Sequence, residues 1–255
     1  MAAGQPEALE TLRQTIRTDR GFSEETSLPF GVSALDQKLG GGLAFGALHE
    51  IAPSAPIHLA AASGFALSIA ARARKKSKSI LLILPDFAGY EAGYFYGAGL
   101  DLFGLLAARL LILRVPRARD ALFAMEEALK CRALSCVISE FAGDGPDLTA
   151  TRRLSLAARD HDGLGIVVRH CTSNIPSAAA TRWAVAATSG PRDRFGGLGK
   201  TAFHLSLIKN RRGPCGEWTL IWNHHDGTFA CAANPVGLAA PAANRPDRAA
   251  RAIAR

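Results

Sequence analysis

The chain has few cysteines, and none of them form a closely spaced pair. Its 255 residues contain five, and no Cys-x-x-Cys motif is present. An odd number without such spacing argues against a disulfide framework. Two of the five lie in apolar segments, so we expect reduced structural thiols in a cytoplasmic protein. The cysteines are Cys131, Cys136, Cys171, Cys215 and Cys231.

The sequence also lacks a long uninterrupted apolar run. Its most apolar stretch, AGLDLFGLLAARLLILRVP, is broken by Asp101, Arg109 and Arg114. Three charges make this stretch unsuitable for crossing a bilayer. The first residues, MAAGQPEALETLRQTIR, contain no apolar core of the kind that secretory signals have. We therefore expect a cytoplasmic location and no membrane partner.

What the chain does have is apolar material for a large core and an excess of positive charge. Hydrophobic residues make up 48% of it, and 30 Lys and Arg against 22 Asp and Glu give a net charge of +8. The length fits one large α/β domain with tails. The basic balance permits contact with nucleic acid or with an acidic partner, but requires neither.

Composition divides the chain into an N-terminal helical segment, a core domain and a basic tail. The three parts are residues 1–26, 27–232 and 233–255. Leu9, Leu12 and Ile16 have helical spacing, which predicts a helix that packs either on its own core or on a neighbouring subunit. The Ala-, Pro- and Arg-rich tail predicts a flexible end. Its Arg248 and Arg251 are candidates for partner binding, and an unpaired, disordered end is the alternative.

Apolar runs alternate with helical patterns through the middle of the chain. SILLILP, LLILRV, LSCVISE and LGIVVRH predict buried parallel strands, and 59–72, 118–133 and 148–160 predict helices between them. This alternation predicts an α/β fold with a doubly wound parallel sheet. After residue 180, TRWAVAAT, TAFHLSLIKN, EWTLIWN and TFACA predict antiparallel strands, and NHHDG predicts a hairpin turn between the last two.

The segment GGLGKT at 196–201 suggests a phosphate loop, but its context argues against one. A phosphate loop has the pattern G-x-x-x-x-G-K-[ST] and opens a helix. Counting back from Gly199 puts Arg194 where the first glycine belongs. The next residues, AFHLSLIKN, alternate like a strand. We therefore predict a basic, Gly-rich loop that leads into a strand.

The segment FGVSALDQKLGGGLAFGALHEI resembles the beginning of the RecA-type ATPase core. Weaker similarities follow in the family's order: SILLILPDFA, FYGAGLDLFGLLAARLLILRV, LSCVISE, LGIVVRH and FHLSLIKNRRGPCGEWTLIW. Together they cover about residues 27–231. The resemblance implies a RecA-like core of the P-loop NTPase type, with a mainly parallel sheet, flanking helices and an antiparallel C-terminal hairpin extension.

The chain departs from that family where the phosphate loop belongs. After HEI it reads APSAPIHLAAASGFALSIAARA, with no lysine between Lys38 and Lys75. The lysine neutralises phosphate charge, and the hydroxyl after it holds magnesium. Pro53 and Pro56 each remove a backbone donor, and Gly64 lies inside the expected helix. We therefore expect no catalytic residues, no cofactor and no ATP hydrolysis.

Three other positions of the family's site are partly filled. The resemblance puts Asp86 where an acid orients the attacking water, Glu140 at the magnesium-binding strand and His170 at the γ-phosphate sensor. Acids at the carboxyl ends of parallel strands are often functional, but strand ends are also simply solvated. We interpret the three residues as a vestigial site.

Basic residues gather on two loops of the C-terminal part. These candidates for contact with a DNA backbone are Arg192, Arg194, Lys200, Lys209, Arg211 and Arg212. The alternative is that they are solvated turn residues. Trp183, Trp218 and Trp222 could stack on bases, but their alternating strands favour core packing. We expect no metal site, and His224 and His225 are interpreted as turn residues.

A RecA-like core without a working phosphate loop, followed by a basic tail, resembles the ImuA family. These proteins, also described as SulA-like, are accessory proteins of the bacterial SOS mutasome. The resemblance implies a role in translesion DNA synthesis beside an ImuB-type inactive relative of Y-family polymerases, an error-prone replicative-type polymerase and RecA. Two alternatives remain open: a RecA-family ATPase with a non-standard phosphate loop, and a SulA-like inhibitor of cell division.

Overall fold

The computed structural model of the protein describes most of the chain between residues 27 and 232. The described residues are 27–73, 78–86, 93–105, 107–143, 145–160, 162–172, 174–191, 197 and 199–232. The predicted N-terminal helix with Leu9, Leu12 and Ile16 lies outside them, as does the tail with Arg248 and Arg251.

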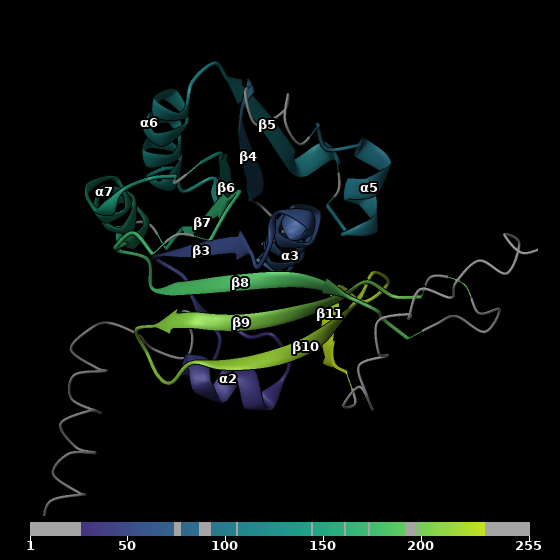
Figure 1. Ribbon diagram of the computed structural model, residues 1–255. Coiled ribbons are helices and arrows are strands. Elements are labelled where there is room, and N and C mark those ends of the chain that lie inside the picture. The colour runs from purple at the N-terminus through teal and green to yellow at the C-terminus, as the bar shows by residue number, and fades with distance from the viewer. Residues whose placement is uncertain are drawn as a thin grey trace, which may run out of the picture.

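Nine strands of the described chain form one sheet in the order β11-β10-β9-β8-β3-β7-β6-β4-β5 (Figure 1). They are β3 (Ala47–Pro53), β4 (Ser79–Pro85), β5 (Leu110–Val115), β6 (Leu134–Phe141), β7 (Leu164–Arg169), β8 (Thr181–Thr188), β9 (Ala202–Asn210), β10 (Gly216–Asn223) and β11 (Thr228–Cys231). Six neighbouring strands of the sheet, β8, β3, β7, β6, β4 and β5, pair in parallel. The remaining pairs, β8 with β9, β9 with β10 and β10 with β11, are antiparallel. The predicted fold class, a mainly parallel sheet with an antiparallel C-terminal extension, is confirmed.

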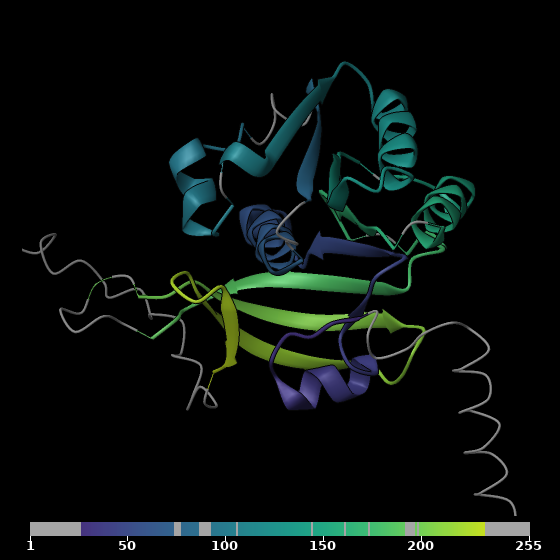
Figure 2. The same cartoon turned by 180° about the vertical axis from the view of Figure 1, so that it is seen from behind.

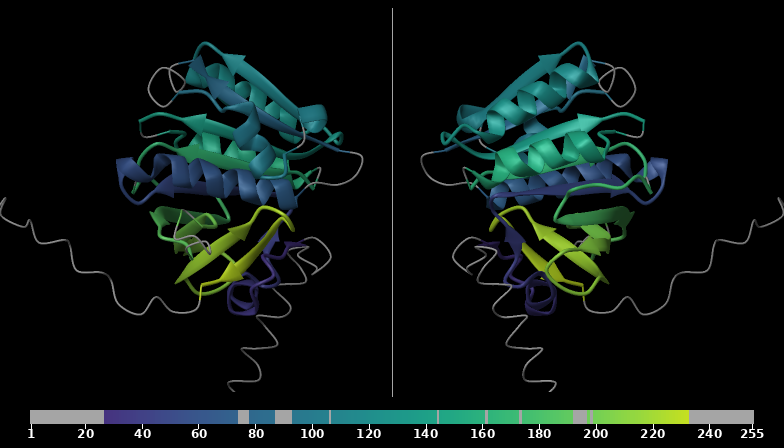
Figure 3. Two further views of the ribbon diagram at one scale, coloured as in Figure 1. Left: turned by 90° about the vertical axis from the view of Figure 1, so that its right-hand side faces the viewer. Right: turned by 90° about the vertical axis from the view of Figure 1, so that its left-hand side faces the viewer.

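Helices cover both faces of this sheet. They are α2 (Ser33–Leu39), α3 (Leu59–Arg72), α5 (Gly97–Leu102), α6 (Ala118–Leu129) and α7 (Leu148–Arg159), with 3-10 turns at Pro56–His58 and Ala107–Arg109. Figures 1 and 2 show α6 and α7 on one face and α3 on the other, with α2 beside β10. In Figure 3 the sheet extends from β5 at the top to β10 and β11 near the bottom. None of the described helices combines the length and apolar character needed to cross a bilayer.

The two faces of the sheet enclose two hydrophobic cores. The larger lies between the sheet, α2 and α3, and contains Trp183, Trp222 and Phe65, each fully buried. The smaller lies under α6 and α7 around Met125 and Leu154. The tryptophans are therefore core residues, as their alternating positions indicated.

The motif at the start of the RecA-type resemblance builds the turn around α2. The Asp36 carboxylate accepts hydrogen bonds from the backbone N–H groups of Phe30 (2.7 Å), Gly31 (2.9 Å) and Val32 (3.1 Å). Gly42 has a φ of 133°, and a Cβ there would overlap the Leu28 carbonyl group. Strands β1 (Ser27–Leu28) and β2 (Leu43–Ala44) pair beside it. These residues shape the chain before β3.

Two predicted strands differ from expectation in their surroundings. LLILRV forms β5, but β5 is an edge strand whose Leu111, Ile112 and Leu113 side chains are exposed, so its predicted burial was wrong. TRWAVAAT forms β8, which pairs antiparallel with β9 but parallel with β3. By contrast, GGLGKT leads into strand β9, and NHHDG forms the turn between β10 and β11, as predicted.

Candidate functional site

The carboxyl ends of β3, β4, β6 and β7 lie at one edge of the sheet, because these strands run parallel. Doubly wound folds bind ligands at this edge. Asp86 follows β4 directly, Glu140 is the penultimate residue of β6, and His170 follows β7. The three residues singled out in the sequence therefore end neighbouring strands of the sheet.

The turn between β3 and α3 has the length of a phosphate loop but not its side chains. β3 ends at Pro53 and α3 begins at Leu59. When the motif G-x-x-x-x-G-K-[ST] starts at Pro53, Pro53 and His58 replace its glycines. Leu59 then stands at the lysine and Ala60 at the hydroxyl residue. The charge and the oxygen that would meet Mg·ATP are both replaced by hydrocarbon.

The backbone donors of this turn are largely missing or already used. Pro53 and Pro56 have no N–H group. The N–H of Ser54 donates to a carbonyl of β8 (2.8 Å), and that of His58 donates to the carbonyl of Ala55 (2.8 Å). A phosphate loop instead presents several free N–H groups to one anion. The turn is thus bound to the neighbouring strand and to itself.

Glu140 and His170 lie close together beside α3. Oγ of Ser63 in α3 donates a hydrogen bond to Glu140 Oε1 (2.8 Å), and Nε2 of His170 lies 3.7 Å from Glu140 Oε2. Both Ser63 and Glu140 are buried. The Glu140 carboxylate of β6 is therefore held by α3, the helix that follows the turn after β3. Within the described residues, no three His, Cys, Asp or Glu side chains are grouped to hold a metal ion.

Asp86 faces strand β5. Its Oδ1 lies 3.2 Å from Nη2 of Arg114, and the same nitrogen donates to the Tyr94 hydroxyl (2.6 Å). The Arg114 guanidinium also lies 4.3 Å from the centre of the Tyr94 ring. Exposed ion pairs of this kind add about 0–1 kcal/mol to stability. The structure thus brings Glu140 and His170 together and places Asp86 in a separate surface cluster.

The basic candidates divide into two groups. Nζ of Lys209 donates to the Ser177 carbonyl (2.5 Å), and Nη2 of Arg212 donates to the Gly40 carbonyl (2.8 Å), so both side chains brace loops. Lys200 and Arg211 are exposed. The other two candidates, Arg192 and Arg194, lie outside the described residues. Of the four described candidates, Lys200 and Arg211 are the two whose side chains are exposed.

A buried ion cluster around Glu50 gave no signal in the sequence analysis. Glu50 lies in β3 and is fully buried. Its Oε1 accepts hydrogen bonds from Nη2 of Arg169 (2.8 Å) and Oγ of Ser177 (2.7 Å), and its Oε2 accepts one from Nε of Arg182 (2.8 Å). Burial alone would raise the pKa of Glu50, but Arg169, Ser177 and Arg182 outweigh it and hold the pKa below its usual value.

The cluster anchors two loops at the candidate edge of the sheet. Arg169 also donates to the Pro146 carbonyl (2.7 Å), in the loop after β6. Arg182 donates to the Ile175 carbonyl (2.8 Å), in the loop between β7 and β8. One carboxylate therefore fixes both loops beside Glu140 and His170. A lone acid in an apolar strand does not reveal this in sequence, because its partners lie more than a hundred residues away.

A second buried polar residue of β3 is held neutral. Nδ1 of His49 lies 2.8 Å from Oγ1 of Thr181, and its Nε2 lies 3.0 Å from the Ala44 carbonyl oxygen. Burial lowers the pKa of His49 to about 4, against a weaker opposite effect of the bond to Ala44, and the charge of Arg212 lowers it further. His49 is therefore a neutral structural link between β3, β8 and β2.

We expect the free energy of unfolding to decrease as the pH falls from 6.5 to about 4, because the unfolded chain protonates His49 before the folded chain does. The expected loss from this group is about 3 kcal/mol. Urea unfolding at several pH values measures it. His49→Gln should flatten the dependence in this window, whereas the exposed control His225→Gln should leave it unchanged. Equal slopes for His49→Gln and the wild type would contradict this assignment.

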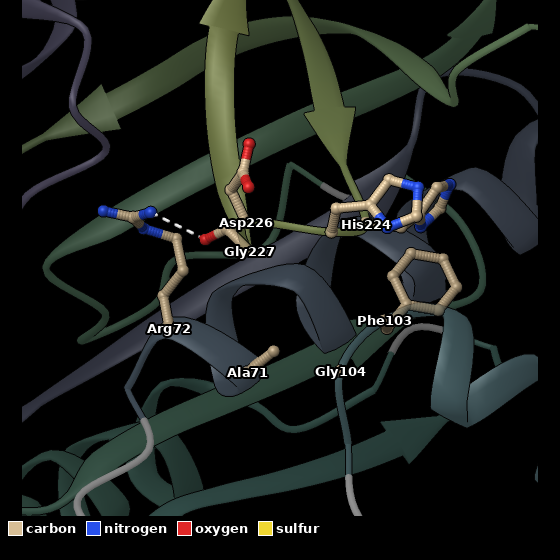
Figure 4. Close-up of a pocket in the computed structure, with 8 residues that line it drawn as sticks. Ala71, Arg72, Phe103, Gly104, His224, Asp226 and Gly227 are labelled. Atoms are coloured by element: carbon tan, nitrogen blue, oxygen red, sulfur yellow. Dashed lines mark hydrogen bonds between the residues drawn. The ribbon is translucent and has the colours of Figure 1, made fainter.

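A cavity of about 390 Å³ lies at the opposite end of α3 from the turn (Figure 4). It is lined by Ala71, Arg72, Phe103, Gly104, His224, His225, Asp226 and Gly227. Arg72 donates to the carbonyls of Gly227 (2.8 Å) and Pro29 (2.8 Å), and the rings of Phe103 and His224 are 6.0 Å apart. Arg72 therefore holds the β10–β11 turn against α3, and Phe103 contacts the same turn.

Comparisons with known proteins agree with this fold. No family model matches the chain. The chain is 29% identical over 208 residues to "Protein ImuA" from Caulobacter vibrioides strain NA1000 / CB15N, covering 76% of this chain and 82% of that protein. The chain is thus similar in sequence to ImuA. "Protein ImuA" of C. vibrioides strain ATCC 19089 / CIP 103742 / CB 15 gives the same values.

The ImuA relationship confirms the resemblance indicated by the sequence motifs. Among solved structures, the RadB recombinase matches with a TM-score of 0.54 and 16% identity, covering 77% of this chain and 96% of that chain. At this identity the likeness concerns the fold alone. The chain therefore has the fold of the RadB recombinase, with Pro53, His58, Leu59 and Ala60 at the phosphate-loop position.

Proposed function

We propose that the protein is an accessory scaffold of SOS-induced translesion DNA synthesis in the cytoplasm, and that it acts without hydrolysing ATP. The homology to ImuA supports a role in DNA damage and mutagenesis of the mutasome class. The proposed partners are an ImuB-type inactive Y-family relative, an error-prone replicative-type polymerase and RecA. Direct contact with DNA through Lys200 and Arg211 is part of the same proposal.

The turn between β3 and α3 carries the proposal. A triphosphate bound there would lack the lysine and hydroxyl of a phosphate loop, because Leu59 and Ala60 occupy those positions. Losing a buried charge-assisted contact weakens binding by about 2–5 kcal/mol. The N–H groups of Ser54 and His58 are engaged in other hydrogen bonds. Each of these features independently opposes Mg·ATP binding.

We expect Glu140→Gln to support damage-induced mutagenesis as well as the wild type does. Glutamine keeps an oxygen that accepts the Ser63 hydrogen bond but removes the charge that an ATPase would need for magnesium. The measurement is mutation frequency after DNA damage in cells that lack their own ImuA. The control is Leu59→Glu, which adds an anion at the expected phosphate position and should also be tolerated.

The runner-up is a RecA-family ATPase with a non-standard phosphate loop. It is favoured by the approach of His170 to Glu140, at 3.7 Å. Binding of a fluorescent ATP analogue to the purified protein distinguishes the two. The ATPase hypothesis would be favoured over the scaffold if the wild type bound the analogue at micromolar concentration and Glu140→Gln, normally folded, lost both this binding and mutagenesis.

A further inference from the structure

Strand β5 forms an apolar edge of the nine-stranded sheet. The side chains of Leu111, Ile112 and Leu113 are 52%, 50% and 39% exposed. Among the described residues, β5 pairs with β4 on one side and with no strand on the other. Its outer backbone groups can therefore pair with another strand, as exposed sheet edges do.

Apart from the charge of Arg114, this edge lacks the features that usually prevent pairing. Proteins protect edges with lysine, proline, bulges or short strands. β5 has no lysine or proline in Leu110–Val115, and it pairs with β4 without a register shift. The opposite edge strand, β11, is only four residues long, and its exposed residues are Thr228, Ala230 and Cys231. The two edges therefore differ in both length and chemistry.

The apolar side chains of β5 divide between the two faces of the sheet. Leu82, which pairs with Ile112, belongs to the core under α3, and Ile83, which pairs with Leu113, belongs to the core under α6 and α7. Successive side chains of a strand alternate in direction. Ile112 is thus on the α3 face, and Leu111 and Leu113 are on the α6 face.

We propose that β5 pairs antiparallel with β5 of a second copy of this chain, about a two-fold axis through Ile112. In this register Leu111 lies opposite Leu113 of the second copy, Leu113 lies opposite its Leu111, and Ile112 faces Ile112. An axis perpendicular to the sheet keeps each face continuous between the copies, so opposite side chains share a face. Their Cβ atoms would lie about 4.5–5.5 Å apart, close enough for apolar contact.

The charges of the strand fit this occupant. Arg114 is the one charged residue of β5, and it is already paired with Asp86 at 3.2 Å. In the proposed register it lies opposite Leu110 of the second copy, so no like charges meet. An acidic strand would find no free cation on Leu110–Leu113, which are all apolar. A neutral apolar strand is the complementary partner, and the chain itself supplies one.

A head-to-tail arrangement fits less well. It would join β5 to β11, which offers Thr228, Ala230 and Cys231 to the three large side chains. Closed two-fold pairing buries the apolar edges of both copies and leaves no growing filament end. The self-complementary register therefore favours a dimer over a chain of subunits.

Sedimentation equilibrium of the full chain over a wide concentration range tests the proposal. The expected result is a reversible dimer whose dissociation constant rises on the order of a hundredfold in Ile112→Lys, because two like charges then meet on the axis. Ile208→Lys is the matched control, since Ile208 in β9 is 53% exposed and lies away from β5. Thermal melting checks that both variants fold.

Charge exchange tests the register itself. Leu111→Glu alone should weaken the dimer, and the double variant Leu111→Glu/Leu113→Lys should restore it, since each acid then faces a cation of the other copy. A wild-type monomer at all concentrations overturns the proposal. So does a dimer that Ile112→Lys leaves intact, which would place the interface elsewhere. A double variant weaker than Leu111→Glu overturns this register.

Discussion

Glu50→Ala is expected to lower the free energy of unfolding at neutral pH by about 3–5 kcal/mol. The substitution leaves the guanidinium of Arg169, which is 1% exposed, without the carboxylate it donates to. It also removes the acceptor of Ser177 and Arg182. Removing one partner of a buried ion pair is costly because the remaining charge is neither hydrated nor neutralised. Urea unfolding at neutral pH measures the change.

The matched control is Glu217→Ala. Glu217 accepts a hydrogen bond from Ser206 (3.0 Å), but its side chain is 68% exposed, so water replaces the lost contact. Its effect should stay within about 1 kcal/mol. A loss below about 1 kcal/mol for Glu50→Ala as well would contradict the prediction, since it would mean that Arg169 finds water or another acceptor at little cost.

Trp183→Ala is expected to cost about 3–5 kcal/mol. Trp183 is fully buried, and its ring centre lies 5.8 Å from that of Phe65, 6.0 Å from that of Phe30 and 6.4 Å from that of Trp218. The truncation removes a large apolar contact and leaves a cavity among rings that cannot all move inwards. It also removes the hydrogen bond that the indole N–H of Trp183 donates to Oγ1 of Thr181 (2.8 Å).

Thermal and urea unfolding measure this loss against Phe123→Ala. Phe123 in α6 is an aromatic residue that is 66% exposed, so its removal should change stability by less than about 0.5 kcal/mol. Trp183→Phe should fall between the two, because phenylalanine fills part of the space. A Trp183→Ala protein as stable as Phe123→Ala would mean that the core closes over the missing indole.

The elements of the fold were largely readable from the sequence. Helix α3 extends over Leu59–Arg72 as its pattern predicted, and the strands after residue 180 appear where alternation placed them. The environment of β5 was not readable. SILLILP and LLILRV are both short apolar runs, yet β4 lies inside the sheet and β5 at its edge. Strand order depends on topology, which a local run does not encode.

The candidate site was readable only in part. The resemblance pointed to Glu140 and His170, which do lie together, but also to Asp86, which pairs with Arg114 on the next strand. The Glu50 cluster was missed because its contacts join residues 119 to 132 positions apart. No periodicity or spacing rule links such distant positions, and only the packed sheet brings them together.

The order of strands has a consequence for how the protein is made. β3 is synthesised early, but one of its two neighbours in the sheet, β8, ends at Thr188. Until the ribosome has passed that residue, one side of β3 has no partner, and the rings that surround Trp183 cannot assemble. Such non-local pairing slows folding and populates aggregation-prone intermediates. Nascent chains of this protein should therefore leave the apolar side chains of β3 uncovered through most of their translation.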